Sequence, residues 1–177
     1  MRKILFILAM VVSLSASVAS AQQRCDSHHE DRPCYEHRGR HHRSPYFVSE
    51  NKVFFDDREI KGASASSFSI LRDGYAKDTW SVYYCGTKMD GASSNSFKVL
   101  GFGYAKDTWN VYFDGKKING ASPESFKVLR DGYAKDTWNV YFDAVKIEGA
   151  SPDSFKVLRD GYAKDTWNTY YFGRKID

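Results

Sequence analysis

A tryptophan recurs every 29 residues through most of this 177-residue chain, and its indole ring is well suited to stacking. Regularly spaced tryptophans that face solvent can stack on sugars or hold quaternary ammonium groups. A tyrosine lies three residues after each tryptophan and could extend the same surface. We therefore take two rings per repeat as candidate ligand-binding residues, namely Trp80, Trp109, Trp138 and Trp167 with Tyr83, Tyr112, Tyr141 and Tyr170.

The same rings could instead form the core, because the repeats contain few leucine and isoleucine residues. We favour this interpretation for most of the aromatic residues. Alternation along a strand would divide the two roles, since successive side chains point to opposite faces. It predicts that Val111 and Phe113 point inward and Tyr112 outward, with Trp109 partly exposed beside a turn.

Acidic and amide side chains also recur along the repeats, as at Asp131, Asp136 and Asn139. Their oxygens could bind calcium, but their spacing fits neither the EF-hand loop nor the glycine-rich nonapeptide pattern. Aspartate beside glycine or threonine usually accepts hydrogen bonds from nearby backbone N–H groups. The pattern therefore favours a turn over a calcium site.

Residues 22–43 differ from the repeats, being rich in histidine, arginine and cysteine and poor in apolar side chains. This composition predicts a flexible segment. Imidazole groups bind zinc, copper or nickel, so metal buffering is one candidate role, although no zinc motif has this spacing. The candidate metal ligands are His28, His29, His37, His41 and His42.

Three cysteines are expected to meet an oxidising compartment. Cys25 and Cys34 lie close together in the flexible segment, so a disulfide between them closes a short loop at little entropic cost. Cys85 occupies a predicted hairpin turn. We expect Cys25 and Cys34 to pair and Cys85 to remain a single thiol, with a link from Cys85 to the flexible segment as the alternative.

Catalytic chemistry is not expected. The repeats contain no histidine, the commonest general base near neutral pH, and no nucleophile elbow, phosphate-binding loop or metalloprotease motif. Near-identical units supply equal copies of each group, whereas enzymes usually converge different groups in one pocket. We predict a protein that is not an enzyme and needs no cofactor.

The elements that position these residues follow from the repeat, whose units begin at residues 46, 75, 104, 133 and 162. Short aromatic and β-branched runs predict strands at 133–136 and 139–142. Asp114-Gly115 predicts a tight hairpin, because glycine readily adopts positive φ. The segment 122–126 predicts a short helical turn, with serine before proline.

A single 29-residue unit buries too little to fold alone, but stacked units can share a continuous core. We therefore predict an all-β fold of tandem β-hairpin repeats, with a short helical turn per unit, stacked as an elongated antiparallel array or β-solenoid. A small closed propeller or barrel is the alternative, because the sequence does not separate open from closed arrangements.

Residues 1–21 have the charged start, short apolar run and small-residue end of a secretory signal peptide. Residues 44–177 form the predicted repeat domain. The formal net charge is +4, and the repeats place Lys and Asp side by side rather than in a basic patch. We therefore expect a secreted or periplasmic protein that does not bind nucleic acid and keeps no stable membrane span once the signal is removed.

The segments Tyr104–Ile118 (YAKDTWNVYFDGKKI) and Gly120–Leu129 (GASPESFKVL) resemble the DKNYY family of bacterial repeat proteins. The resemblance covers roughly residues 46–177, although Thr-Trp replaces the Lys-Asn part of the family pattern in four units. It implies an exported or envelope-associated protein whose biochemical role is unassigned, and it supplies no catalytic residues.

These observations together predict an interaction or structural module of the cell envelope. A glycan or the cell wall is the candidate partner for the tyrosines and tryptophans, and metal buffering by the histidines is a second alternative.

Overall fold

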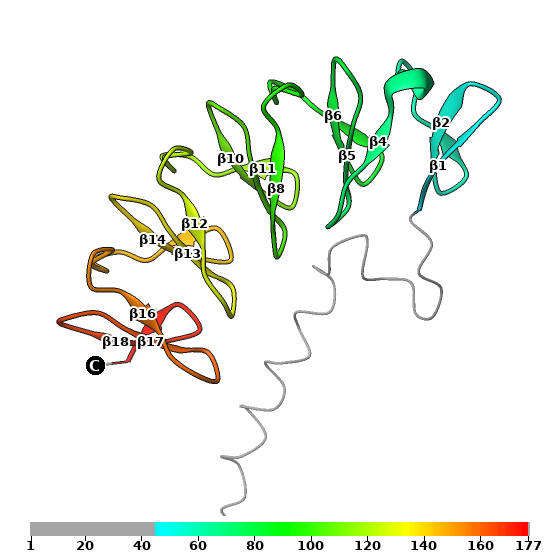
Figure 1. The fold of residues 1–177 in the computed structure, drawn as a ribbon. Helices are drawn as coiled ribbons and strands as arrows, with labels where there is room; N and C mark the ends of the chain where they lie inside the picture. Colours follow the sequence, from blue (N-terminus) through cyan, green and yellow to red (C-terminus); the bar gives the residue numbers. More distant parts are fainter. Residues whose placement is uncertain (1–44, 177) are drawn as a thin grey trace, which may run out of the picture. The chain divides into compact units, whose positions relative to one another are not determined.

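A computed structural model describes residues 45–176, all within one compact unit, Pro33–Asp177. The signal peptide and the histidine-rich segment lie outside the described residues. The described chain forms five antiparallel sheets that follow one another in chain order, and none closes into a barrel (Figure 1). This confirms the predicted array of β-hairpin repeats.

The first sheet has three strands and each later sheet has four, always hydrogen-bonded in sequential order. Sheet 1 contains β1 (Tyr46–Ser49), β2 (Lys52–Phe55) and β3 (Arg58–Glu59). Sheet 2 contains β4 (Ser69–Ile70), β5 (Tyr75–Lys77), β6 (Val82–Tyr84) and β7 (Thr87–Met89). Sheet 3 contains β8 (Lys98–Gly101), β9 (Tyr104–Lys106), β10 (Val111–Phe113) and β11 (Lys116–Lys117). Sheet 4 contains β12 (Lys127–Val128), β13 (Tyr133–Lys135), β14 (Val140–Phe142) and β15 (Val145–Lys146). Sheet 5 contains β16 (Lys156–Val157), β17 (Tyr162–Lys164), β18 (Thr169–Tyr171) and β19 (Arg174–Lys175).

Each four-stranded sheet crosses a repeat boundary. Its first strand belongs to the end of one 29-residue unit and its other three strands belong to the next unit. In sheet 4, for example, Val128 of β12 pairs with Ala134 of β13 across the boundary before Tyr133. Consecutive units are therefore joined by backbone ladders as well as by side-chain packing.

The hairpin predicted at Asp114-Gly115 is confirmed as the turn between β10 and β11. Asp114 and Gly115 both have positive φ, 46° and 75°. Two-residue turns of this hand match the right-handed twist of the flanking strands. An added Cβ on Gly115 would lie 2.6 Å from the Tyr84 ring of the preceding sheet, so glycine also permits close stacking.

The predicted helical turn is reduced to a single hydrogen-bonded turn in most units. A short 3-10 helix, η2, forms at Ala65–Ser67 in the first unit. In later units the same place holds one backbone bond, such as that from Phe155 N to Pro152 O at 3.4 Å. Such a turn is too short to propagate a helix, because nucleation fixes several residues for one hydrogen bond.

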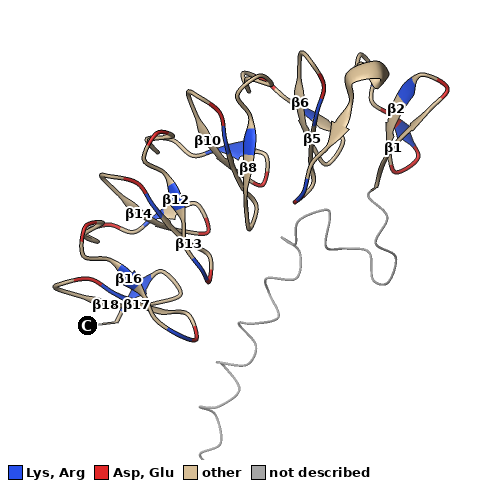
Figure 2. Cartoon of the chain, in the orientation of Figure 1, with Lys and Arg blue, Asp and Glu red and all other residues tan. Residues whose placement is uncertain are grey.

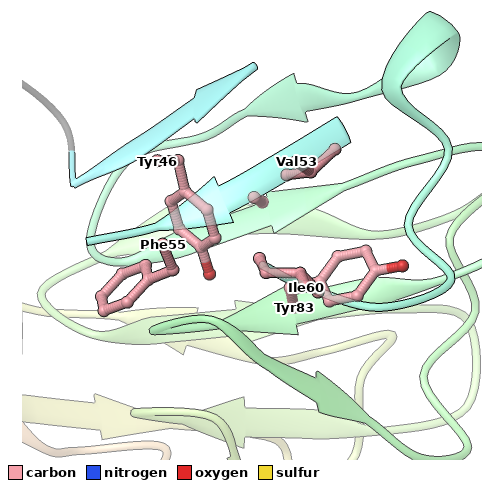
Figure 3. Packing of buried hydrophobic residues seen from close by; sticks show 6 residues of the cluster. Tyr46, Val53, Phe55, Ile60 and Tyr83 are labelled. Atoms are coloured by element: carbon pink, nitrogen blue, oxygen red, sulfur yellow. The ribbon is translucent and has the colours of Figure 1, made fainter. Parts of the chain in front are cut away.

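The core lies between neighbouring sheets, in four similar clusters. One 29-residue unit contributes a tyrosine, a valine, a phenylalanine and an isoleucine or methionine, and the next unit contributes an alanine and a tyrosine. Figure 3 shows the cluster between sheets 1 and 2, with Tyr46, Val53, Phe55, Ile60 and Tyr83. The equivalent cluster between sheets 4 and 5 contains Tyr133, Val140, Ile147, Phe155, Ala163 and Tyr170.

The central strands of an interior sheet are consequently buried on both faces. In β13, Tyr133 packs against sheet 5 and Ala134 packs against sheet 3, and neither side chain is exposed. Burying a large apolar side chain contributes about 1.5 to 3 kcal/mol, so a few rings per interface supply much of the stability.

A buried tyrosine hydroxyl also joins each sheet to the next. The Tyr75 hydroxyl donates to Gly103 O at 2.9 Å and accepts from Gly115 N at 3.0 Å. It thereby ties together two turns of the following sheet. The hydroxyls of Tyr46, Tyr104 and Tyr133 each make the same pair of hydrogen bonds to the sheet that follows their own.

Candidate functional site

The four repeated tryptophans lie at the hairpin tips, the turns that connect the second and third strands of sheets 2 to 5. Each side chain is largely exposed. The exposed fractions are 82% for Trp80, 76% for Trp109, 76% for Trp138 and 80% for Trp167. The prediction that these rings are partly exposed is confirmed, and the four residues are called the Trp ladder below.

A buried aspartate organises each hairpin tip from within. At the tip of sheet 3, Asp107 Oδ1 accepts hydrogen bonds from Trp109 N and Asn110 N, both at 2.7 Å. Asp107 Oδ2 accepts from the Tyr112 hydroxyl and from Ser93 N, both at 2.9 Å. Asp78, Asp136 and Asp165 accept the corresponding bonds at the other tips.

The preceding loop holds the tip from outside. Thr108 N donates to Ser96 Oγ at 3.1 Å, and Ser93 N reaches Asp107 from the same loop. The backbone on both sides of Trp109 is therefore fixed, although its ring is exposed. A ring on a fixed backbone loses less conformational freedom when a ligand stacks on it.

The electrostatics of the tip keep its aspartate charged. Burial acts to raise the pKa of Asp165, but hydrogen bonds from Ser151, Trp167, Tyr170 and Asn168 outweigh it and lower the pKa to about 2. The same balance lowers the pKa of the two carboxyls of Asp78 and Asp107.

The phenols that face these carboxylates shift in the opposite direction. Burial and the hydrogen bond to Asp107 raise the pKa of Tyr112 to about 12, and burial with the bond to Asp78 does the same for Tyr83. The phenol therefore remains the donor and the carboxylate the acceptor over the whole physiological pH range.

The four candidate tyrosines belong to the core, so assigning them to a ligand surface was wrong. Tyr83, Tyr112, Tyr141 and Tyr170 are all buried, with their hydroxyls on the tip aspartates. Strand alternation predicted that Tyr112 points outward because it assumed that one face of each sheet is exposed to solvent. Here Val111 and Tyr112 do point to opposite faces, but a neighbouring sheet covers each of them.

The acidic side chains serve the turns, as the alternative to calcium predicted. Asp136 accepts four hydrogen bonds from N–H and O–H groups, and Asn139 contributes its backbone N–H to one of them. Asp131 occupies a left-handed turn position with φ of 58°. Among residues 45–176, no group of three His, Cys, Asp or Glu side chains could hold a metal ion. The five histidines lie outside this range.

Cys85 lies at the β6–β7 hairpin turn, as predicted, with φ of 47°. Its thiol is disulfide-bonded, so the prediction of a single thiol at this position was wrong. Cys25 and Cys34 lie outside the described residues.

Comparison with known protein families finds a match for the later repeats. Residues 104–177 match the family model described as the DKNYY family. The match begins at residue 104, two units later than the resemblance suggested. Sheet 2 is built largely from the unit that begins at residue 75, and it nevertheless has the same strand order as sheets 3 to 5. No curated protein and no solved structure matches the chain. In the part of the chain that the structure describes, no helix has the length and apolar character needed to cross a membrane.

Proposed function

Residues 104–177 match the DKNYY family, and we propose that the chain is an exported, non-enzymatic repeat protein that binds a glycan of the cell envelope through its Trp ladder. The observation that carries this proposal is the exposure of one tryptophan per sheet on a hydrogen-bonded tip. Large apolar side chains are costly to leave in water, and the fold buries the repeated tyrosine three residues after each tryptophan.

The fixed tip argues that these tryptophans have a role outside the core. Nothing in the packing of sheet 3 requires an indole at Trp109, because the turn is made by Asp107 and by backbone N–H groups. An asparagine, Asn51, occupies the turn of the first hairpin, where the two central residues have φ of 50° and 60°. A functioning hairpin tip in this fold can therefore lack tryptophan.

A sugar fits the ladder better than a nucleic acid does. Aromatic rings stack on the apolar faces of pyranoses without needing charge. Acidic and basic positions are both distributed over all five sheets (Figure 2). Several lysines are also engaged within the fold, such as Lys106, whose Nζ donates to Pro123 O at 2.7 Å.

Repetition favours a polymer over a small ligand. Four equal rings on consecutive sheets can contact four segments of one chain. Each contact after the first is then intramolecular, which can strengthen binding by about 100-fold without any new kind of interaction. A glycan strand of the cell wall has the repeated chemistry that such a surface requires. The predicted signal peptide would bring the protein to that strand.

The proposal is tested by removing the rings and keeping the tips. Binding of the purified protein to isolated peptidoglycan is measured by sedimentation, with soluble β-1,4-linked hexasaccharide and monosaccharide as competitors. Replacing all four tryptophans with alanine should weaken binding by about 100-fold, whereas each single replacement should weaken it far less.

The matched control changes a neighbouring side chain at the same four tips. Thr79, Thr108, Thr137 and Thr166 are exposed, and their replacement by alanine keeps the backbone N–H groups that hold the tips. This variant should bind like the original protein. Equal binding by the tryptophan and threonine variants would overturn the proposal.

A further inference from the structure

One turn departs from the repeat in a way that the fold does not require. Three of the turns between the first and second strands of a sheet read Arg-Asp-Gly, whereas sheet 3 has Gly101, Phe102 and Gly103. Phe102 has φ of 53° and is 69% exposed. The sister aspartates tolerate this left-handed conformation, whereas it is strained for phenylalanine.

The same departure removes an arginine that covers the edge of the next sheet elsewhere. Arg72 donates to Val99 O at 3.4 Å, and Arg130 donates to Val157 O at 3.1 Å. At the intervening position, Gly101 has no side chain with which to reach Val128. The edge strand β12 is therefore left without this cover.

A groove lies where the two changes meet. It has a volume of about 670 Å³ and runs from Phe102 along the edge strands of sheets 4 and 5. Its apolar lining includes Phe102, Val128, Leu129 and Val157. The volume is within the range of small-molecule sites, about 300 to 1,000 Å³.

The charged part of the lining is entirely basic. Arg130, Lys135 and Lys156 line the groove, and none of its lining residues is acidic. Lys135 donates to Pro152 O at 2.6 Å and Arg130 donates to Val157 O, and both Arg130 and Lys156 are exposed to solvent. Basic residues also mark β12 and β16 in the ribbon (Figure 2). The groove is therefore complementary to a ligand with one apolar end and one negative end.

We propose that this groove binds a small amphipathic anion of the fatty-carboxylate class. The alkyl chain lies against Phe102, Val128 and Leu129, and the carboxylate lies near Arg130 and Lys156. The strained, exposed Phe102 provides apolar contact area for the alkyl chain. An aspartate at the same position would instead place a negative charge beside the ligand. The groove does not include the Trp ladder, so this proposal and the glycan proposal can fail separately.

Dodecanoate is the probe, and its binding to the full chain is measured by isothermal titration calorimetry below the concentration at which it forms micelles. Dodecanol, with the same chain and no charge, should bind at least about tenfold more weakly. Phe102→Asp restores the residue of the sister turns, so it should fold well and bind dodecanoate at least about tenfold more weakly. Phe102→Ala provides a second test if the aspartate variant does not fold.

A pair of lysine variants separates local charge from total charge. Lys156→Gln removes a lining cation and should weaken binding about threefold, as expected for an exposed charge. Lys127→Gln removes an exposed lysine of β12 whose side chain does not line the groove. This variant should leave the affinity for dodecanoate within about twofold. The proposal would be overturned if the original protein did not bind dodecanoate, or if Phe102→Asp bound it with equal affinity. It would also be overturned if the protein bound only to anionic lipid vesicles and not to dodecanoate itself.

Discussion

The interfaces between sheets and the hairpin tips use aromatic residues in opposite ways. Tyr141 is buried between two sheets, whereas Trp138, three residues earlier on the same hairpin, is 76% exposed. Both residues depend on Asp136, which accepts a hydrogen bond from the Tyr141 hydroxyl and another from the Trp138 backbone. One carboxylate therefore fixes a core ring by its side chain and a surface ring by its backbone. The comparison separates rings that hold the fold from rings that the fold only presents.

The strongest test of this comparison removes the shared carboxylate. Asp107→Ala leaves the Tyr112 hydroxyl and the N–H groups of Ser93, Trp109 and Asn110 without their acceptor. We expect the free energy of unfolding to fall by about 3 kcal/mol, measured by urea denaturation followed by circular dichroism. Trp109→Ala should change it by less than about 0.5 kcal/mol. Equal losses in the two variants would mean that the tryptophan also supports the fold.

Acid should act selectively on the same carboxylates. The pKa of Asp165 is lowered to about 2 in the folded protein, whereas an unfolded aspartate has a pKa of about 3.9. Its contribution is therefore present above about pH 4 and is lost as the pH falls toward 2. Urea midpoints at pH 7, 4, 3 and 2 should show this decline. Asp165→Asn should make the decline shallower, and an unchanged slope would contradict the assignment.

A smaller effect should distinguish an interior tyrosine from its counterpart in the last sheet. The Tyr104 hydroxyl donates to Gly132 O and accepts from Ala144 N at 2.9 Å, so Tyr104→Phe should cost about 1.5 kcal/mol. Tyr162 holds the equivalent position in sheet 5 and is 42% exposed. Tyr162→Phe should cost less than about 0.5 kcal/mol in the same urea assay. A similar cost for both would show that the hydroxyl bonds between sheets contribute little.

The repeat period made most of the fold predictable. Equal spacing of Trp80 and Trp109 indicated a stacked array, and Asp114-Gly115 located a hairpin, because both signals are local or periodic. The sharing of each sheet between two units was not predictable in this way. The residues around Val128 contain no local signal that it pairs with Ala134 of the next unit rather than with a strand of its own unit.

The candidate site was predictable where exposure follows from a turn, and not where it depends on the neighbouring sheet. The Trp ladder was located correctly because a hairpin tip projects from the sheet. The outward orientation of Tyr112 was wrong because stacking covers both faces. The substitution of Phe102 was visible in the aligned units, but the groove beside it required the positions of β12 and β16.

The sharing of each sheet between units has a consequence for how such genes can change in length. A duplication or deletion of 29 codons can begin at any point of the repeat, because β12 finds an equivalent of β13 in whichever unit follows it. The strand order and the stacking of rings are then restored automatically. An odd number of residues inserted within a strand would shift the alternation of inward and outward side chains. Selection can therefore adjust the number of exposed tryptophans in whole steps without redesigning the core.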